Sequence, residues 1–142
     1  MAHNIRASKT PMVLLGELFL LLLLMVGEGS AASAPGQTRT HSGGGVTVKV
    51  TYLNPQAADG ARFEVVLDTH SANLDAYDLK ALSILRDEAG KGYEATQAED
   101  KGSGHHRQIT LVFPKLPSGI KRLDLLIRDI AGVKERVFRW EF

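Results

Sequence analysis

The chain has 142 residues, enough for one domain, and its 17 Lys and Arg residues nearly balance 16 Asp and Glu residues for a net charge of +1. Nucleic-acid binding depends on clustered, uncompensated positive charge, so this balance excludes a DNA or RNA protein. The sequence contains no cysteine, which excludes disulfide scaffolds, thiolate zinc sites, iron–sulfur clusters and thiol catalysis.

Residues 1–34 predict an export segment. Arg6 and Lys9 supply a basic start, Met12–Val26 is mostly apolar, and small residues follow as far as Ala34. This order of basic, apolar and small-residue regions is typical of a secretory signal. The apolar run predicts an N-terminal hydrophobic helix, and export places the rest of the chain in the periplasm or outside the cell.

Two outcomes are open for this segment, which are cleavage as a signal peptide and retention as a membrane anchor. A spanning helix needs about 20 apolar residues, whereas the run Met12–Val26 is shorter and includes Glu17. We therefore expect cleavage, after Ala31 or Ala32, ahead of anchoring, and both outcomes export the folded part. Residues 35–45 hold no large apolar side chain and predict a flexible linker.

From residue 46 onward the sequence shows the alternation that is typical of half-buried strands. Val46, Val48, Val50 and Tyr52 are separated by single residues, most of them polar. The apolar run at residues 79–85 fits a central strand or a short helix, and its length favours a strand. The seven predicted strands of the domain, residues 46–142, are residues 46–52, 62–68, 79–85, 93–97, 108–113, 122–128 and 137–142, with a polar loop at 98–106.

Short strands joined by turns, without a long helical pattern, predict an all-β fold, a seven-stranded antiparallel β-sandwich of the Greek-key type. In outline, residues 46–142 resemble the small immunoglobulin-like or fibronectin type III-like modules of exported bacterial proteins. The resemblance implies an immunoglobulin-like sandwich, in which the second strand pairs antiparallel with the fifth.

That pairing brings four candidate ligands to one rim of the molecule. The end of the second strand, with Asp68 and His70, would lie beside the start of the fifth, with His105 and His106. Imidazole and carboxylate groups suit divalent ions such as zinc, nickel or copper(II), so these residues are a candidate metal site. The alternative is that they are loop residues with local hydrogen bonds. The loops with Asp75, Asp78 and Asp129 leave from the same rim.

The last two predicted strands carry basic residues interleaved with acidic ones. Such an arrangement predicts a solvent face with ion pairs, each of which contributes little to stability. The basic residues are Arg122, Arg128, Lys134, Arg136 and Arg139, and the acidic ones are Asp124, Asp129, Glu135 and Glu141.

The sequence predicts an exported, non-enzymatic module that binds a ligand or a protein partner in the cell envelope through its loop rim. Motifs for nucleophilic catalysis or for phosphate binding do not stand out in the sequence. The alternative is a divalent-metal-binding protein that uses the His and Asp cluster, and a divalent metal ion is the cofactor that this cluster could hold. Contact with a membrane is expected only through residues 12–26.

Overall fold

The computed structural model describes Met1, residues 37–55 and residues 59–142. The predictions made for residues 1–34, including the hydrophobic helix, lie outside these residues. Within the described ranges, no helix is long and apolar enough to cross a membrane.

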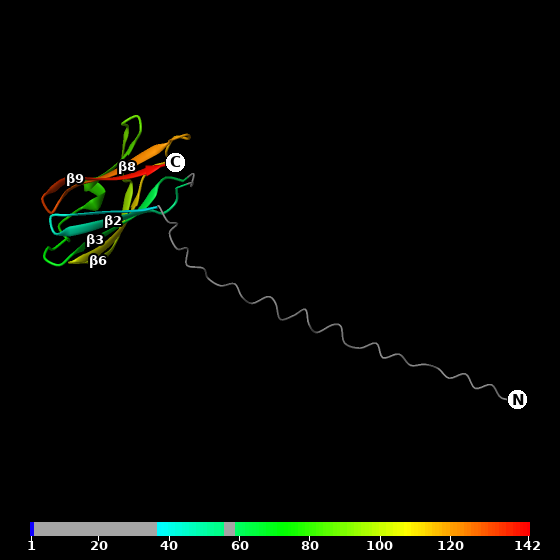
Figure 1. Ribbon diagram of the computed structural model, residues 1–142, viewed down its shortest axis with the longest axis horizontal. Helices are drawn as coiled ribbons and strands as arrows, with labels where there is room; N and C mark the ends of the chain where they lie inside the picture. Colours follow the sequence, from blue (N-terminus) through cyan, green and yellow to red (C-terminus); the bar gives the residue numbers. More distant parts are fainter. Residues whose placement is uncertain (2–36, 56–58) are drawn as a thin grey trace. The chain divides into compact units, whose positions relative to one another are not determined.

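The described residues form two antiparallel sheets, which confirms the all-β class and the two-sheet arrangement (Figure 1). One sheet has the order β1-β2-β3-β7-β6 and the other the order β5-β4-β8-β9. Figure 1 shows β8 and β9 in one layer and β2, β3 and β6 in the other. The first sheet consists of β1 (Thr38–Gly43), β2 (Val46–Tyr52), β3 (Arg62–Thr69), β6 (Gln97–Ser103) and β7 (His106–Val112). The second consists of β4 (Ser83–Asp87), β5 (Gly92–Glu94), β8 (Arg122–Ile130) and β9 (Val133–Glu141).

Apolar alternation correctly predicted the strands that build the core. The expected strand 46–52 is β2, and its apolar residues are buried in the core. The expected pairing of the second predicted strand with the fifth is the β3–β7 pair, in which Asp68 lies opposite His106. Side chains that point between the sheets form one core, with a ring cluster that includes Tyr52, Phe63 and Trp140.

Nine strands occur in the described ranges, not seven, and both additional strands lie where polar segments were expected. Part of the expected linker 35–45 forms β1, which pairs with β2 through a hairpin turn at Gly44 and Gly45. Both glycines have positive φ, as a tight two-residue hairpin requires. The expected loop 98–106 is largely β6, an edge strand whose seven residues are all exposed. Neither strand has a buried apolar face, so both are held by backbone pairing and by polar side-chain contacts, such as the Thr38–Thr51 hydrogen bond in β1 and the Asp100–Arg107 ion pair in β6.

The segment 79–85 contains both elements that its apolar run allowed. A single helical turn, α1 (Leu79–Leu82), leads directly into β4. The Asp78 carboxylate caps this turn by accepting hydrogen bonds from the amides of Lys80 and Ala81. The turn places Leu79 in the core. The segment that connects the first sheet to the second therefore also contributes an apolar side chain to the core.

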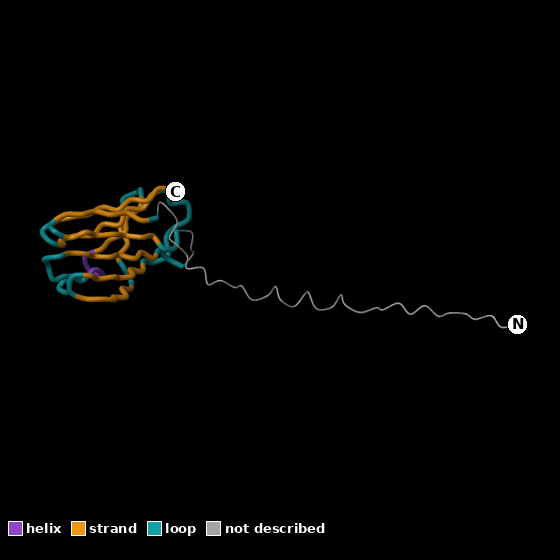
Figure 2. Tube along the Cα trace, turned by 60° about the horizontal axis from the view of Figure 1, so that its bottom comes forward, coloured by secondary structure: helices purple, strands orange, loops and turns teal. Residues whose placement is uncertain are grey.

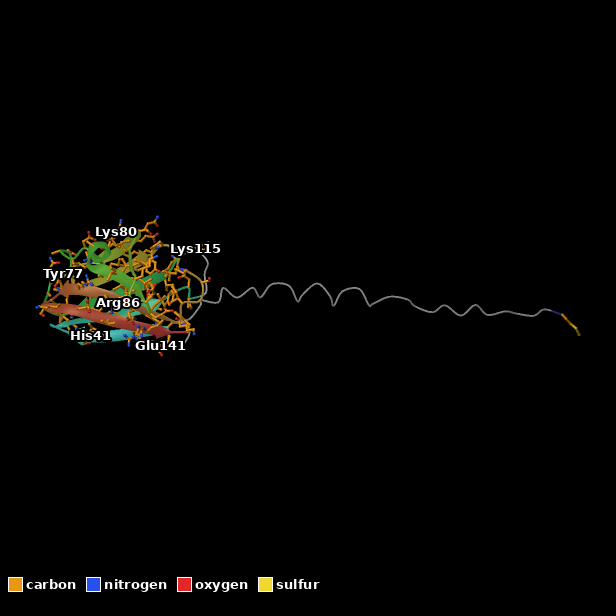
Figure 3. All side chains as sticks on the ribbon, turned by 90° about the horizontal axis from the view of Figure 1, so that it is seen from above. His41, Tyr77, Lys80, Arg86, Lys115 and Glu141 are labelled. Carbon is orange, nitrogen blue, oxygen red and sulfur yellow. The ribbon has the colours of Figure 1, made fainter. Side chains whose placement is uncertain are left out.

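The strands run between two loop-bearing ends of the sandwich (Figure 2). We call one the hairpin end, which includes the β1–β2 turn at Gly44 and the β8–β9 turn at Ala131. The other is the pocket end, where β2 finishes at Tyr52 and β8 begins at Arg122. Figure 3 places Tyr77 toward the hairpin end and Lys115 toward the pocket end.

Candidate functional site

The four residues of the predicted metal site lie at the hairpin end, but they do not converge on one point. The His106 Nδ1 atom is 3.1 Å from the Asp68 Oδ1 atom, and both side chains are largely exposed. The His105 ring instead lies on the loop, with Nδ1 2.8 Å from the carbonyl oxygen of Ala72. His70 is exposed on the turn that follows β3.

Two of the three carboxylates expected at the same rim are engaged with the backbone. Asp75 accepts a hydrogen bond of 2.7 Å from the amide of Gly104, and Asp78 caps α1. Asp129 adopts a positive φ of 53° beside the β8–β9 turn. Across residues 37–55 and 59–142, no three His, Cys, Asp or Glu side chains come together in a way that could hold a metal ion. The structure thus brings one predicted pair together, Asp68 with His106, while His105, Asp75 and Asp78 contact nearby backbone groups.

Behind this rim lies the buried Arg107, which holds the long loop between β3 and α1. Its guanidinium donates to the carbonyl oxygens of Leu74 and Tyr77 and forms an ion pair with Asp100. The loop therefore folds over a charged side chain, and Leu74 is fully buried there. Sequence analysis assigned no role to Arg107.

Arg136 is the second buried arginine, and it corrects the prediction of a continuous solvent face on the last two strands. Its side chain is fully buried, and it donates from Nη1 to the Ile130 carbonyl at 3.0 Å and from Nη2 to the Gly43 carbonyl at 2.7 Å. It forms no ion pair with a described carboxylate. Burial lowers the pKa of the Arg136 guanidinium below its ordinary value. Arg136 therefore ties the β1–β2 hairpin to the β8–β9 hairpin.

Other charges on these strands do form the predicted ion pairs. Arg139 binds Asp124 through two hydrogen bonds of 2.7 and 3.1 Å, and Arg86 adds a contact of 3.6 Å. The hydrogen bond from Arg139 holds the pKa of the Asp124 carboxyl below its ordinary value, although burial acts in the opposite direction. Arg128 pairs with Glu135 at 3.2 Å on the surface. The prediction of paired charges is confirmed for these residues.

The pocket end holds a cavity of about 470 Å³. Tyr52, at the end of β2, lies in its wall with Leu123 of β8, while the loop after Pro114 contributes Leu116 and Ile120. Phe142 completes an apolar wall, and its ring meets that of Tyr52 edge to face at a centroid distance of 6.0 Å. The volume suits a small apolar ligand or one large side chain of a partner.

Two backbone segments pack closely beside this cavity, whose lining includes Ala61 and Lys115. Gly60 has a φ of 107°, and a Cβ atom built there would lie 2.3 Å from the carbonyl oxygen of Phe113. Glycine at this position therefore lets the segment before β3 lie directly against the segment after β7, where the Phe113 amide donates to the Ala61 carbonyl at 2.9 Å.

Tyr52 is the lining residue of this cavity that combines an aromatic ring with a hydroxyl group. The ring stacks on Phe63 at 4.4 Å and is largely buried, which raises the pKa of Tyr52 above its ordinary value. No described residue forms a hydrogen bond with this hydroxyl, while the Trp140 indole, the next ring in the cluster, donates to the Gln37 carbonyl at 2.9 Å. A buried aromatic ring with an unused hydroxyl beside a cavity is suited to bind a ligand that is apolar and carries one hydrogen-bonding group.

Sequence analysis missed this cavity because its wall comes partly from a loop. Two signals in the sequence indicate it. Leu116 and Ile120 are large apolar residues within a turn region rich in Pro, Ser and Gly, and Phe142 lies in register with the inward-facing Trp140. Phe142 contributes to the wall of the cavity and remains 56% exposed.

A comparison with protein-family models finds no match to the chain, and a search of curated proteins finds none either. The site is therefore interpreted from its own geometry.

Proposed function

We propose that this protein is an exported, non-enzymatic β-sandwich module of the immunoglobulin-like class that binds an apolar ligand or the apolar side chain of a partner in the cell envelope. The class is supported by the two antiparallel sheets and by the β3–β7 pair between the second and fifth predicted strands. Export is supported by the basic, apolar and small-residue order of residues 1–34.

The observation that carries the binding function is the cavity at the pocket end. Its wall is largely aromatic and aliphatic, and it includes Tyr52, whose hydroxyl forms no hydrogen bond with a described residue. A binding site of this kind gains affinity from apolar burial and orientation from one hydrogen bond. A second cavity, of about 560 Å³, lies beside α1 and is lined by Asp78, Lys80, Glu94 and Arg128 among others, so its wall is largely polar and less suited to an apolar ligand.

The proposal is tested with 1-octanol as the probe, titrated into the full chain. Trp140 is the chain's one tryptophan and lies 5.9 Å from the Tyr52 ring, so its fluorescence reports on the cavity. We expect saturable binding with a dissociation constant on the order of 1 mM or tighter, equivalent to about 4 kcal/mol. A linear, unsaturable change in Trp140 emission contradicts the proposal.

A matched pair of variants locates the binding. Ile120→Asp places a charge in the cavity wall, and Val137→Asp places the same charge on the outer face of β9, where Val137 is 42% exposed. We expect Ile120→Asp to weaken octanol binding by about tenfold, since a charge disfavours apolar burial, and Val137→Asp to leave it unchanged. Equal effects of the two variants would place the binding elsewhere.

A further inference from the structure

We propose that the second cavity, beside α1, binds a small zwitterion of the α-amino acid type, which carries one ammonium group and one carboxylate group. We call this cavity the side cavity. It shares no lining residue with the cavity at the pocket end, so the inference does not depend on the proposed function. Three observations support it, which are the signs of the charges in its lining, their pairing, and a buried hydroxyl group.

The side cavity lies away from the side of the sandwich where β1 and β9 meet. There the Arg39 guanidinium of β1 donates to the Arg139 carbonyl oxygen of β9 at 2.9 Å. In the second sheet β5 is the edge strand opposite β9, and it borders the side cavity together with α1 and the start of β4. Figure 3 accordingly shows Lys80 of α1 on the opposite side of the domain from His41 of β1. Since Lys80 and Glu94 are both exposed, a dissolved small molecule can reach this cavity.

The charges that line the side cavity have both signs in equal number. Lys80 and Arg128 are positive, and Asp78 and Glu94 are negative. A ligand with both signs can place each of its charged groups beside an opposite charge, whereas a simple anion or cation would also meet like charge. The volume of about 560 Å³ lies in the range of small-molecule sites. The lining therefore favours a zwitterion over a ligand with a single charge.

Two of these four charges are available to a ligand. Arg128 forms an ion pair with Glu135 at 3.2 Å, and the Asp78 carboxylate caps α1. Lys80 and Glu94 form no ion pair with a described residue. We therefore assign the carboxylate of the ligand to Lys80 and its ammonium group to Glu94.

The hydroxyl group of Ser83, a further lining residue, has no partner among the described residues. Ser83 is only 4% exposed, and its Oγ atom is buried without a hydrogen bond. Buried polar groups in folded proteins almost always have a partner, because they have given up their hydrogen bonds to water. Lys80 belongs to α1, which leads directly into Ser83. The carboxylate that Lys80 binds would therefore also accept the hydrogen bond from this hydroxyl.

The remaining lining residues favour a ligand with a short aliphatic side chain. Ala81, Ile84 and Ala95 provide apolar surface between the charged groups. Burial of an aliphatic side chain against them would add to the affinity. Leucine combines such a side chain with both charged groups, and we choose it as the probe.

The experiment titrates L-leucine into the full, isotope-labelled chain and follows the backbone amides by NMR. Isocaproate, which lacks the ammonium group, and isoamylamine, which lacks the carboxylate, are titrated for comparison. We expect saturable leucine binding with a dissociation constant on the order of 1 mM or tighter, with the largest shifts at Ser83, Ile84 and Glu94. Each analogue should bind at least about tenfold more weakly.

Three outcomes of this titration contradict the inference. Failure of leucine to saturate any amide, or shifts that centre on residues outside the side cavity, would remove the site. Binding of isocaproate or isoamylamine as tight as that of leucine would overturn the assignment to a zwitterion. Saturating leucine should leave octanol binding unchanged, and competition between the two would overturn the separation of the two cavities.

Charge-removing variants test the two assigned partners. Lys80→Gln and Glu94→Gln each remove one charge from the side cavity, and we expect each to weaken leucine binding about tenfold. The matched controls are Lys134→Gln on β9 and Glu99→Gln on β6, which remove exposed charges outside the cavity and should leave the affinity unchanged. Equal weakening by a control and its partner variant would show a non-specific charge effect and overturn the assignment.

Ser83→Ala separates binding from stability. Because the Ser83 hydroxyl has no described partner, its removal should not lower the urea midpoint of unfolding, but it should weaken leucine binding about fivefold. Unchanged affinity would remove Ser83 from the site. A lower midpoint would show that the hydroxyl already has a partner in the folded chain, and either result overturns its proposed role.

Discussion

The two ends of the sandwich use their polar groups in opposite ways. At the hairpin end two buried arginines and several loop carboxylates bind backbone groups, and the two hairpin turns are locked together. At the pocket end an aromatic wall encloses a cavity, and a tyrosine hydroxyl has no described partner. The polar residues that the sequence suggested as a site, at the hairpin end, therefore mainly stabilise the fold. The pocket end, with its cavity and the Tyr52 hydroxyl, is better suited to binding.

The largest effect is expected for Arg136→Ala, which removes the link between the hairpins. The variant loses two hydrogen bonds from a charged donor and leaves the carbonyl oxygens of Gly43 and Ile130 without their partner. We expect the free energy of unfolding, measured with urea, to fall by about 4 kcal/mol. Arg128→Ala, on the exposed pair with Glu135, is the matched control and is expected to cost about 0.5 kcal/mol. Similar losses in the two variants would show that the hairpin end is not held by Arg136.

Gly44→Ala tests how tightly the two hairpins approach. Gly44 has a φ of 63°, and a Cβ atom built there would lie 2.0 Å from the Ala131 carbonyl oxygen. Gly104 has a similar φ of 70° with nothing within 4 Å, so Gly104→Ala measures the conformational cost alone. We expect losses of about 3 kcal/mol for Gly44→Ala and about 1 kcal/mol for Gly104→Ala in thermal or urea unfolding. Equal losses would contradict the close contact of the two turns.

Replacing one tyrosine with phenylalanine at each end compares the contribution of the two hydroxyl groups to stability directly. The Tyr77 hydroxyl accepts a hydrogen bond of 3.0 Å from the Ala131 amide, whereas the Tyr52 hydroxyl has no described partner. We expect Tyr77→Phe to lower the free energy of unfolding by about 1 kcal/mol and Tyr52→Phe to change it by less than about 0.5 kcal/mol. Tyr52→Phe should instead weaken the binding of octanol. A loss of stability from Tyr52→Phe equal to that from Tyr77→Phe would remove the contrast between the ends.

The smallest effect concerns Asp124, which lies in the sheet between the two ends. Because Arg139 lowers the pKa of Asp124 in the folded chain, the stability that this pair contributes is present above the unfolded pKa of about 3.9 and is lost as pH falls through the lower, folded pKa. Urea unfolding at pH 7 and pH 3 should therefore show a smaller loss of stability on acidification for Arg139→Gln than for the parent chain. Lys134→Gln removes a positive charge from the same strand without contacting Asp124, and it should leave this loss unchanged.

Sequence reasoning succeeded where a buried face leaves an alternating pattern. Val48 and Val50 in β2, and Leu123 and Leu125 in β8, are fully or almost fully buried as predicted. It failed for β1 and β6 because an edge strand can be held by backbone pairing, which leaves no signal in the side chains. The Gly-Gly pair before β2 is the turn signal that indicates β1.

The candidate site was predictable only in part. Asp68 and His106 meet as the expected β3–β7 pairing requires, but the loop conformations that direct His70 and His105 elsewhere are not encoded in alternation. The two buried arginines are in phase with apolar residues of their strands, as Arg107 is with Ile109. Extending the alternation to the charged residues that precede Ile109 and Phe138 would have predicted the burial of Arg107 and Arg136. The cavity depends on how two loops pack, and a sequence pattern does not determine that packing.

The polar edge strand β6 affects whether concentrated copies of this chain can pair through their strand edges. Open strand edges can pair with each other and polymerise, particularly when proteins are concentrated on a surface. Glu99, Asp100 and Lys101 place charge along this edge, and all seven residues of the strand face solvent. Pairing of two β6 edges would have to desolvate these charges, which disfavours polymerisation of the chain through this edge.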